Sequence, residues 1–224
     1  MRSFVRDNSL SLFFGLIFLG SLVGQSLAGM AQFNQQQLAD SMATVDYGQY
    51  VTSSDFAVDV AENWQSEYLQ FLLYILATVW LVQRGSVESK MPAEIGTESD
   101  EDQEVGSHAP ADAPRSAWAG GFRQAMFSTS LGIVMGLIFL ASWLAQSLAG
   151  VASYNQQQIS QREDPVSWLS YLVTSEFWNR TLQNWQSEFL AVGSMAVLSV
   201  YLRQRGSPQS KPVGAPHAAT GVEG

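Results

Sequence analysis

The sequence predicts an all-α membrane protein with four transmembrane helices, arranged as two tandem parallel repeats of two helices each, with helical extensions on the outer side. Three observations support this fold. Two uncharged stretches, 10–29 and 131–150, are each long enough to cross about 30 Å of hydrocarbon as a helix. The chain repeats its own motifs at a constant spacing, and its lysines and arginines are unevenly distributed between the segments that join the apolar stretches.

The repeat becomes visible when the chain is compared with itself at an offset of 121 residues. Residues 9–90 then align with residues 130–211 without a gap, and 36 of the 82 positions are identical. The shared motifs are GLIFL, QSLAG, NQQQ, NWQSE and QRGS. Compositional bias does not explain the match, because Trp, Asn, Glu and Arg are among the identical residues. We infer an internal duplication.

The duplication divides the chain into four segments. The first membrane repeat occupies 1–90 and the second 119–211. Between them, residues 91–118 carry seven acidic residues and few large apolar ones, which predicts a disordered acidic linker. The tail, 212–224, is rich in Pro, Gly and Ala and is predicted to be disordered as well.

The first apolar stretch has a second interpretation, as a cleaved signal peptide. Arg2 and Arg6 precede it and small residues follow it, as they do in signal peptides. The internal copy at 131–150 is not an N-terminal signal, and the two stretches share their motifs. We therefore interpret both stretches as membrane spans.

The second span of each repeat is less apolar. The run 68–82 has 15 residues and is too short alone, but 64–83 reaches about 30 Å as a helix, and 185–204 is its copy. Trp64 and Trp185 then lie at the membrane interface, where tryptophan is enriched, and anchor the helices. Serine followed by an acid at 54–55 and 175–176 predicts that each helix begins outside the span and ends near the QRGS motif.

The orientation follows from the basic residues. Of the eleven Lys and Arg, only Arg162 and Arg180 lie in the two segments that join the helices within a repeat. The positive-inside rule therefore places the N-terminus, the linker and the C-terminus in the cytoplasm.

Six polar side chains lie near the outer ends of the predicted spans: Gln25, Asn63 and Glu67 in the first repeat, and Gln146, Asn184 and Glu188 in the second. An amide in hydrocarbon needs a hydrogen-bond partner, so we expect one glutamine–glutamate pair in each repeat, extended outward by the asparagine. Two alternatives stay open for the glutamates. They reach water as interfacial groups, or they handle a proton or a cation.

Small residues recur every four positions in the first span of each repeat: Gly20, Gly24 and Ala28, and then Ala141, Ala145 and Ala149. Such a stripe predicts close helix packing, within one chain or between chains. The NQQQ runs that follow are interpreted as solvated helix ends, with binding of a sugar or peptide as the alternative. Aromatic residues in 47–56 and 168–177 suggest that each loop returns to the interface.

The sequence does not contain the enzyme and cofactor-binding motifs that we searched for. The chain has no cysteine, and its two histidines, His108 and His217, lie in the linker and the tail. No P-loop, dinucleotide fingerprint, nucleophile elbow or metal-ligand spacing is present. We therefore predict no catalytic, cofactor-binding or metal-binding residue. Without clustered Lys and Arg, nucleic acid is not an expected partner.

The combination of GLIFL, QSLAG, NQQQ, NWQSE and QRGS resembles a bacterial family of integral membrane proteins classed as a domain of unknown function. The resemblance covers both repeats. It implies a bacterial cytoplasmic (inner) membrane protein with several spans, and it implies no activity and no site residues.

These observations favour a non-enzymatic membrane scaffold or partner-binding protein. The expected partners are the lipid bilayer and a second copy or another membrane protein. One alternative is a small transporter or channel that uses the outer-leaflet Gln/Glu cluster at the repeat interface. The least supported alternative is a membrane enzyme, for which only Glu67 and Glu188 offer acid–base chemistry.

Overall fold

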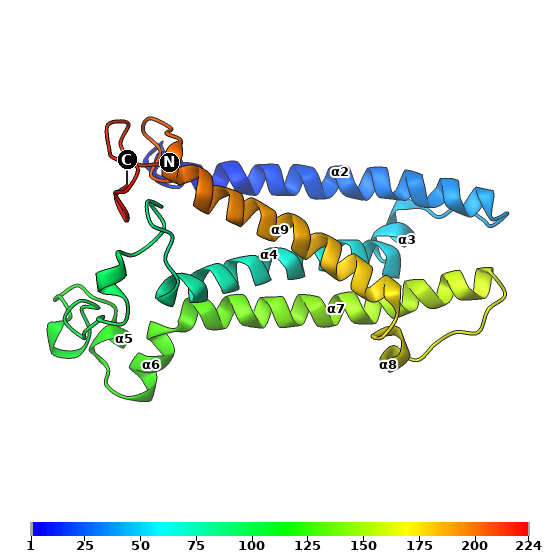
Figure 1. Cartoon of the computed structure of the whole chain (residues 1–224). Helices are drawn as coiled ribbons and strands as arrows, with labels where there is room; N and C mark the ends of the chain where they lie inside the picture. Colours follow the sequence, from blue (N-terminus) through cyan, green and yellow to red (C-terminus); the bar gives the residue numbers. More distant parts are fainter. Residues whose placement is uncertain (1, 224) are drawn as a thin grey trace. The chain divides into compact units, whose positions relative to one another are not determined.

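The structure is a computed structural model that describes residues 2–223, and all regular elements among these residues are helical (Figure 1). The long helices are α2 (Ser9–Ala39), α4 (Ser54–Trp80), α7 (Ser130–Ser160) and α9 (Ser175–Tyr201). The short ones are α1 (Arg2–Asp7), α3 (Tyr47–Val51), α5 (Arg115–Trp118), α6 (Phe122–Ser128), α8 (Trp168–Tyr171) and two 3₁₀ helices, η1 (Pro92–Glu94) and η2 (Gly106–His108). The predicted all-α class is confirmed.

The long helices recur with the spacing of the sequence motifs. Both α2 and α7 have 31 residues, and both α4 and α9 have 27. Each helix of the second half begins 121 positions after its counterpart. Both α2 and α7 also continue ten residues beyond the predicted spans, about 15 Å of additional helix.

Two of the four long helices, α2 and α7, are long and apolar enough to cross a membrane. Their most apolar 18-residue windows are 6% and 17% buried, so most of this apolar surface is uncovered. The other two, α4 and α9, do not meet the same criterion within the described residues. Membrane association therefore has structural support, whereas the four-span arrangement stays a prediction.

Both α2 and α7 end in the same hydrogen-bonded turn. After α2, Ser41 adopts a φ of 60°, its N–H donates to Leu38 O at 3.1 Å, and Met42 N–H donates to Gln37 O at 2.7 Å. After α7, Arg162 adopts a φ of 62° and the same two bonds form. This is a Schellman motif, which satisfies helix-terminal carbonyls and usually has glycine at the left-handed position.

The helices α4 and α9 end earlier than the sequence predicts. They stop at Trp80 and Tyr201, so the last three residues of the predicted spans 64–83 and 185–204 lie outside the helix. The N–H of Gln83 donates to Ser89 Oγ at 2.9 Å, and that of Gln204 donates to Ser210 Oγ at 2.8 Å. These side-chain bonds replace the next helical bonds, and the backbone turns away.

The chain forms two compact units, and each is described by itself. Unit 1 comprises 1–61 and 144–177, and unit 2 comprises 62–143 and 178–224. In unit 1, the loop aromatics form the core: Tyr50 lies against Phe56 with ring centroids 5.5 Å apart, and Tyr171 lies against Phe177 at 5.6 Å. Both tyrosines are almost completely buried.

In unit 2, two glycines of α7 face leucines of α4. A Cβ on Gly132 would lie 3.7 Å from Leu76, and one on Gly136 would lie 3.7 Å from Leu72. A methyl group at either position would therefore be in ordinary van der Waals contact with the facing leucine.

The tail contacts the QRGS turn within unit 2. Gly85 N–H donates to Thr220 Oγ1 at 2.8 Å, and Gly221 N–H donates to Ser86 O at 3.0 Å. The ammonium of Lys211 is buried and donates to His217 O at 2.8 Å. The predicted disorder of the linker and tail stays a prediction.

Candidate functional site

In the first half of the chain, the QSLAG and NQQQ motifs attach the following loop to α2. Ser26 Oγ of QSLAG lies 2.9 Å from the hydroxyl of Tyr47. Asn34 of NQQQ forms two bonds to one residue: its Nδ2 donates to Val45 O at 2.9 Å, and its Oδ1 accepts from Val45 N at 2.7 Å. An amide that pairs with both backbone groups of Val45 fixes the loop in one register.

The second half repeats these contacts. Trp168 Nε1 donates to Ser147 Oγ at 3.0 Å. Asn155 forms the same two bonds to Val166, at 2.9 and 2.8 Å. The polar partner of the QSLAG serine changes from tyrosine to tryptophan, but its position in the loop does not.

The glycine of QSLAG makes room for a buried tyrosine. A Cβ on Gly29 would collide with the hydroxyl of Tyr50, and one on Gly150 would lie 2.5 Å from the hydroxyl of Tyr171. Any larger residue would displace the tyrosine from the core of unit 1. In each half, the serine and glycine of QSLAG and the asparagine of NQQQ thus hold the following loop against the helix.

In unit 2, polar side chains join α4 to α9. The guanidinium Nε of Arg180 donates to the carboxylate of Glu62 at 2.6 Å, and both side chains are mostly buried. One turn along, Trp185 Nε1 donates to Gln65 Oε1 at 2.9 Å. The side chain of Gln65 is completely buried, and its Nε2 has no hydrogen-bond partner among the described residues.

An aromatic cluster surrounds the Trp185 ring. Trp143 of α7 lies 6.1 Å from Trp185 and 6.4 Å from Trp178 between ring centroids, and it stacks on Phe139 at 5.5 Å. The indole that donates to Gln65 is thus also packed against Trp143 of α7.

The structure places the six predicted polar residues in different environments. Gln146 is buried and Gln25 half-buried in unit 1. In unit 2, Glu67 is exposed and Glu188 half-buried. The glutamine–glutamate pairs stay a prediction.

The two asparagines and the two tryptophan anchors of the NWQSE motifs also differ between the copies. Asn63 is exposed, whereas Asn184 is half-buried and donates to Arg180 O at 3.0 Å. Trp64 is 42% exposed, whereas Trp185 is half-buried and holds Gln65. The asparagine and tryptophan are thus more buried in the second copy, whereas the following glutamine and serine are more buried in the first.

The predicted packing stripe lies largely on open surface. A Cβ on Gly20 or Gly24 would meet no atom within 4 Å. Ala28, Ala141 and Ala145 are exposed, and Ala149 is half-buried. The packing role of this stripe stays a prediction.

Sequence reasoning did not single out Gln65, Glu62 or Arg180. The motif NWQSE contains Gln65, and a helical wheel places it one position from the tryptophan, on another face. Glu62 is paired with Arg180 although their repeat counterparts are Gln183 and Asp59, so no repeated pattern marks the ion pair.

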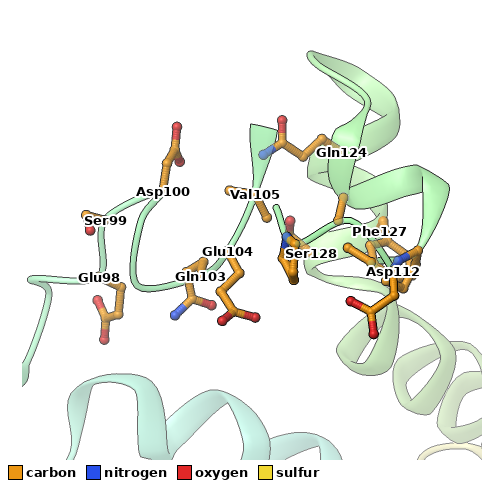
Figure 2. Close-up of a pocket in the computed structure, with 14 residues that line it drawn as sticks. Glu98, Ser99, Asp100, Gln103, Glu104, Val105, Asp112, Gln124, Phe127 and Ser128 are labelled. Carbon is orange, nitrogen blue, oxygen red and sulfur yellow. The ribbon is translucent and has the colours of Figure 1, made fainter. Parts of the chain in front are cut away.

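An acidic pocket of about 520 Å³ lies in unit 2, lined by the 98–105 loop, residues 110–117 and α6 (Figure 2). Glu98 is hydrogen-bonded to the ammonium of Lys90, which lowers the pKa of that carboxyl. Ser99 Oγ donates to Asp102 at 2.7 Å and lowers its pKa in the same way. No group of three acidic or His side chains in the described part of the chain stands close enough to hold a metal ion.

Comparison with protein families gives one result. A family model described as "Domain of unknown function (DUF6766)" matches residues 1–222. Neither the curated proteins nor the solved structures contain a match.

Proposed function

The chain belongs to the family described as Domain of unknown function (DUF6766), and from this premise we propose that it is a multi-pass integral membrane protein that acts as a non-enzymatic scaffold or binds a partner protein. The observation that carries the proposal is the uncovered apolar surface of α2 and α7, whose windows are only 6% and 17% buried. Apolar helices of this length require lipid or another protein to cover them.

We propose that α4 and α9 are the remaining two spans. The predicted span within each helix contains one glutamate, Glu67 or Glu188, as well as glutamines, which lowers its hydropathy. The Gln65–Trp185 bond supports this assignment, because polar groups in membrane helices are paired with a neighbouring helix. Equal helix lengths at a spacing of 121 support a tandem duplication with two parallel repeats.

The distribution of Lys and Arg supports a topology with the N-terminus, linker and C-terminus in the cytoplasm. In this topology the attached loops 40–53 and 161–174 face outward. We propose the bacterial cytoplasmic membrane as the location. A rigid outer surface, held by Asn34 and Asn155, suits a scaffold better than a mobile loop.

A transporter or channel is the second candidate, and one observation favours it. Glu67 and Glu188 lie in the same unit, at the matching position of the two NWQSE motifs. Carboxylates within membrane helices are candidates for handling a proton or a cation. A membrane enzyme is the third candidate and would have to use the same two glutamates.

Proton flux separates the first two candidates. The purified chain is reconstituted into liposomes with a trapped pH-sensitive dye, and an imposed proton gradient is followed. If the chain is a scaffold, the proton gradient is as stable as in empty liposomes. In mild detergent extracts of native membranes, the chain then migrates as a larger species than the purified chain does. Flux that Glu67→Gln and Glu188→Gln abolish, with migration as the purified chain, would contradict the scaffold.

A further inference from the structure

A second pocket, of about 460 Å³, lies wholly within unit 1, where α2 and α7 end and α4 begins. Both NQQQ runs contribute glutamines to its rim, and the volume is in the range of small-molecule sites. The sequence predicted mainly solvated helix ends at these positions. The structure instead brings the two runs to one pocket.

The floor of the pocket contains a carboxylate that is only half satisfied. Asp55, in the first turn of α4, accepts a hydrogen bond from Ser153 Oγ at 2.8 Å through its Oδ1. Its Oδ2 is buried and has no hydrogen-bond partner among the described residues. A buried carboxylate oxygen without a donor is costly, so this atom favours a ligand that brings one.

The charge around the pocket is negative. Asp40 at the end of α2 joins Asp55, and no Lys or Arg lines the pocket. Neither α2 nor α7 has a basic residue in its last turn, although Arg162 follows the end of α7 by two residues. The neighbouring Tyr50 experiences this field: burial raises its pKa, and the charges of Asp59 and Asp55 raise it further.

The remaining lining selects the kind of cation. Glutamine amides and Ser160 offer hydrogen-bond acceptors, while Phe33 and Met42 offer apolar contact for a carbon chain. No group of three acidic or His side chains in the described residues is placed to hold a metal ion. A neutral sugar would satisfy the amides but leave two carboxylates uncompensated.

We propose that this pocket binds a small aliphatic amine with more than one ammonium group, with Asp55 as the principal charge partner and Asp40 as the second. One ammonium group pairs with the carboxylate of Asp55, the methylene chain lies along Phe33 and Met42, and a second ammonium lies near Asp40. The binding does not depend on the proposed scaffold role or on membrane orientation.

The test is calorimetric titration of the full chain in detergent with spermidine, with sucrose and Mg²⁺ as comparison probes. Spermidine binds, its affinity falls with added salt, and neither comparison probe competes. Asp55→Asn weakens spermidine binding about tenfold or more, because a charge-assisted hydrogen bond is lost.

The matched control is Glu176→Gln, which removes an acid at the equivalent position of α9, in the same unit but outside the pocket lining. It keeps the wild-type affinity. Because Asp55→Asn affects a half-buried residue, Asp40→Asn on the exposed rim serves as a second variant, and it weakens binding several-fold. Equal affinities for wild type and both Asp variants would overturn the proposal, as would preferential binding of sucrose or Mg²⁺, or the absence of spermidine binding.

Discussion

Gln65 accepts a hydrogen bond from Trp185 Nε1 at 2.9 Å, so the glutamine of the first NWQSE motif meets the tryptophan of the second. The two copies of one motif therefore contact each other within unit 2. The opposite pair would join the glutamine of the second motif to the tryptophan of the first, but Gln186 is exposed and Trp64 is 42% exposed. The duplicated motif thus supplies both halves of one buried interaction.

Replacing Gln65 tests this interaction. Gln65→Leu leaves the indole N–H of the half-buried Trp185 without its acceptor and is expected to cost about 1–2 kcal/mol of stability. Gln186→Leu is the matched control at the exposed copy and should stay within about 0.5 kcal/mol of wild type. Thermal unfolding of both purified variants in detergent measures the difference. Equal melting temperatures for the two variants would show that the buried bond contributes no stability.

The glycine of QSLAG is predicted to be sensitive to a single methyl group. Gly150→Ala places a Cβ against the Tyr171 hydroxyl and should destabilise the chain by about 1–3 kcal/mol. Gly20→Ala adds the same methyl where nothing lies within 4 Å and should be neutral or slightly stabilising, because alanine favours helix.

The equivalent contact in the first half can be tested with a second, compensating substitution. In Gly29→Ala, removal of the hydroxyl by Tyr50→Phe is expected to restore part of the lost stability. Strictly additive losses in this double variant would argue against the contact.

The asparagines of NQQQ are predicted to hold the loops 40–53 and 161–174 against the preceding helices. Asn155→Ala removes both side-chain bonds to Val166, so trypsin should cleave after Arg162 several-fold faster than in wild type. Gln156→Ala, on the exposed part of the same run, is the control. Digestion is followed by mass spectrometry. Cleavage at the same rate in both variants would mean that the loop is held by other contacts.

Much of the fold follows from the sequence because the duplication and the apolar runs are long. The starts of α4 and α9 were predictable from Ser54 and Ser175, each followed by an acid. The ends at Trp80 and Tyr201 were not, because the serine hydroxyls that replace the next helical bonds lie six residues further along the chain. Local patterns do not reveal such returning contacts.

The candidate site was predictable only in part. The sequence drew attention to Gln25 and Gln146 of QSLAG, but not to the serine and glycine of that motif, which contact the loop aromatics. Likewise, Asp55 was expected only to favour the start of a helix, and its contact with Ser153 spans 98 residues of sequence. Long-range polar contacts depend on how helices pack, which periodicity alone does not determine.

Alkaline pH is predicted to weaken the core of unit 1. The pKa of Tyr50 is raised above its ordinary value of 10.0, first by burial and then by Asp59 and Asp55. The folded chain therefore binds this proton more tightly than the unfolded chain. The resulting stability is present below a pH of about 10 and is lost as the pH rises beyond it.

Unfolding midpoints measured across this alkaline range provide the check. They should fall more steeply for wild type than for Tyr50→Phe, which has no phenol to ionise, and Asp55→Asn should lie between them. Identical slopes for wild type and Tyr50→Phe would contradict the assignment.

The four-span arrangement is tested most directly by two single-cysteine variants, Ser41→Cys and Ser107→Cys, in a chain that has no cysteine of its own. Intact cells are treated with a membrane-impermeant thiol reagent, and permeabilised cells serve as the control for reactivity. Four spans with a cytoplasmic linker predict that the cysteine at 41 is labelled from outside and that the one at 107 is labelled only after permeabilisation. If only α2 and α7 crossed the membrane, both cysteines would be labelled from outside, and that result would contradict the four-span account.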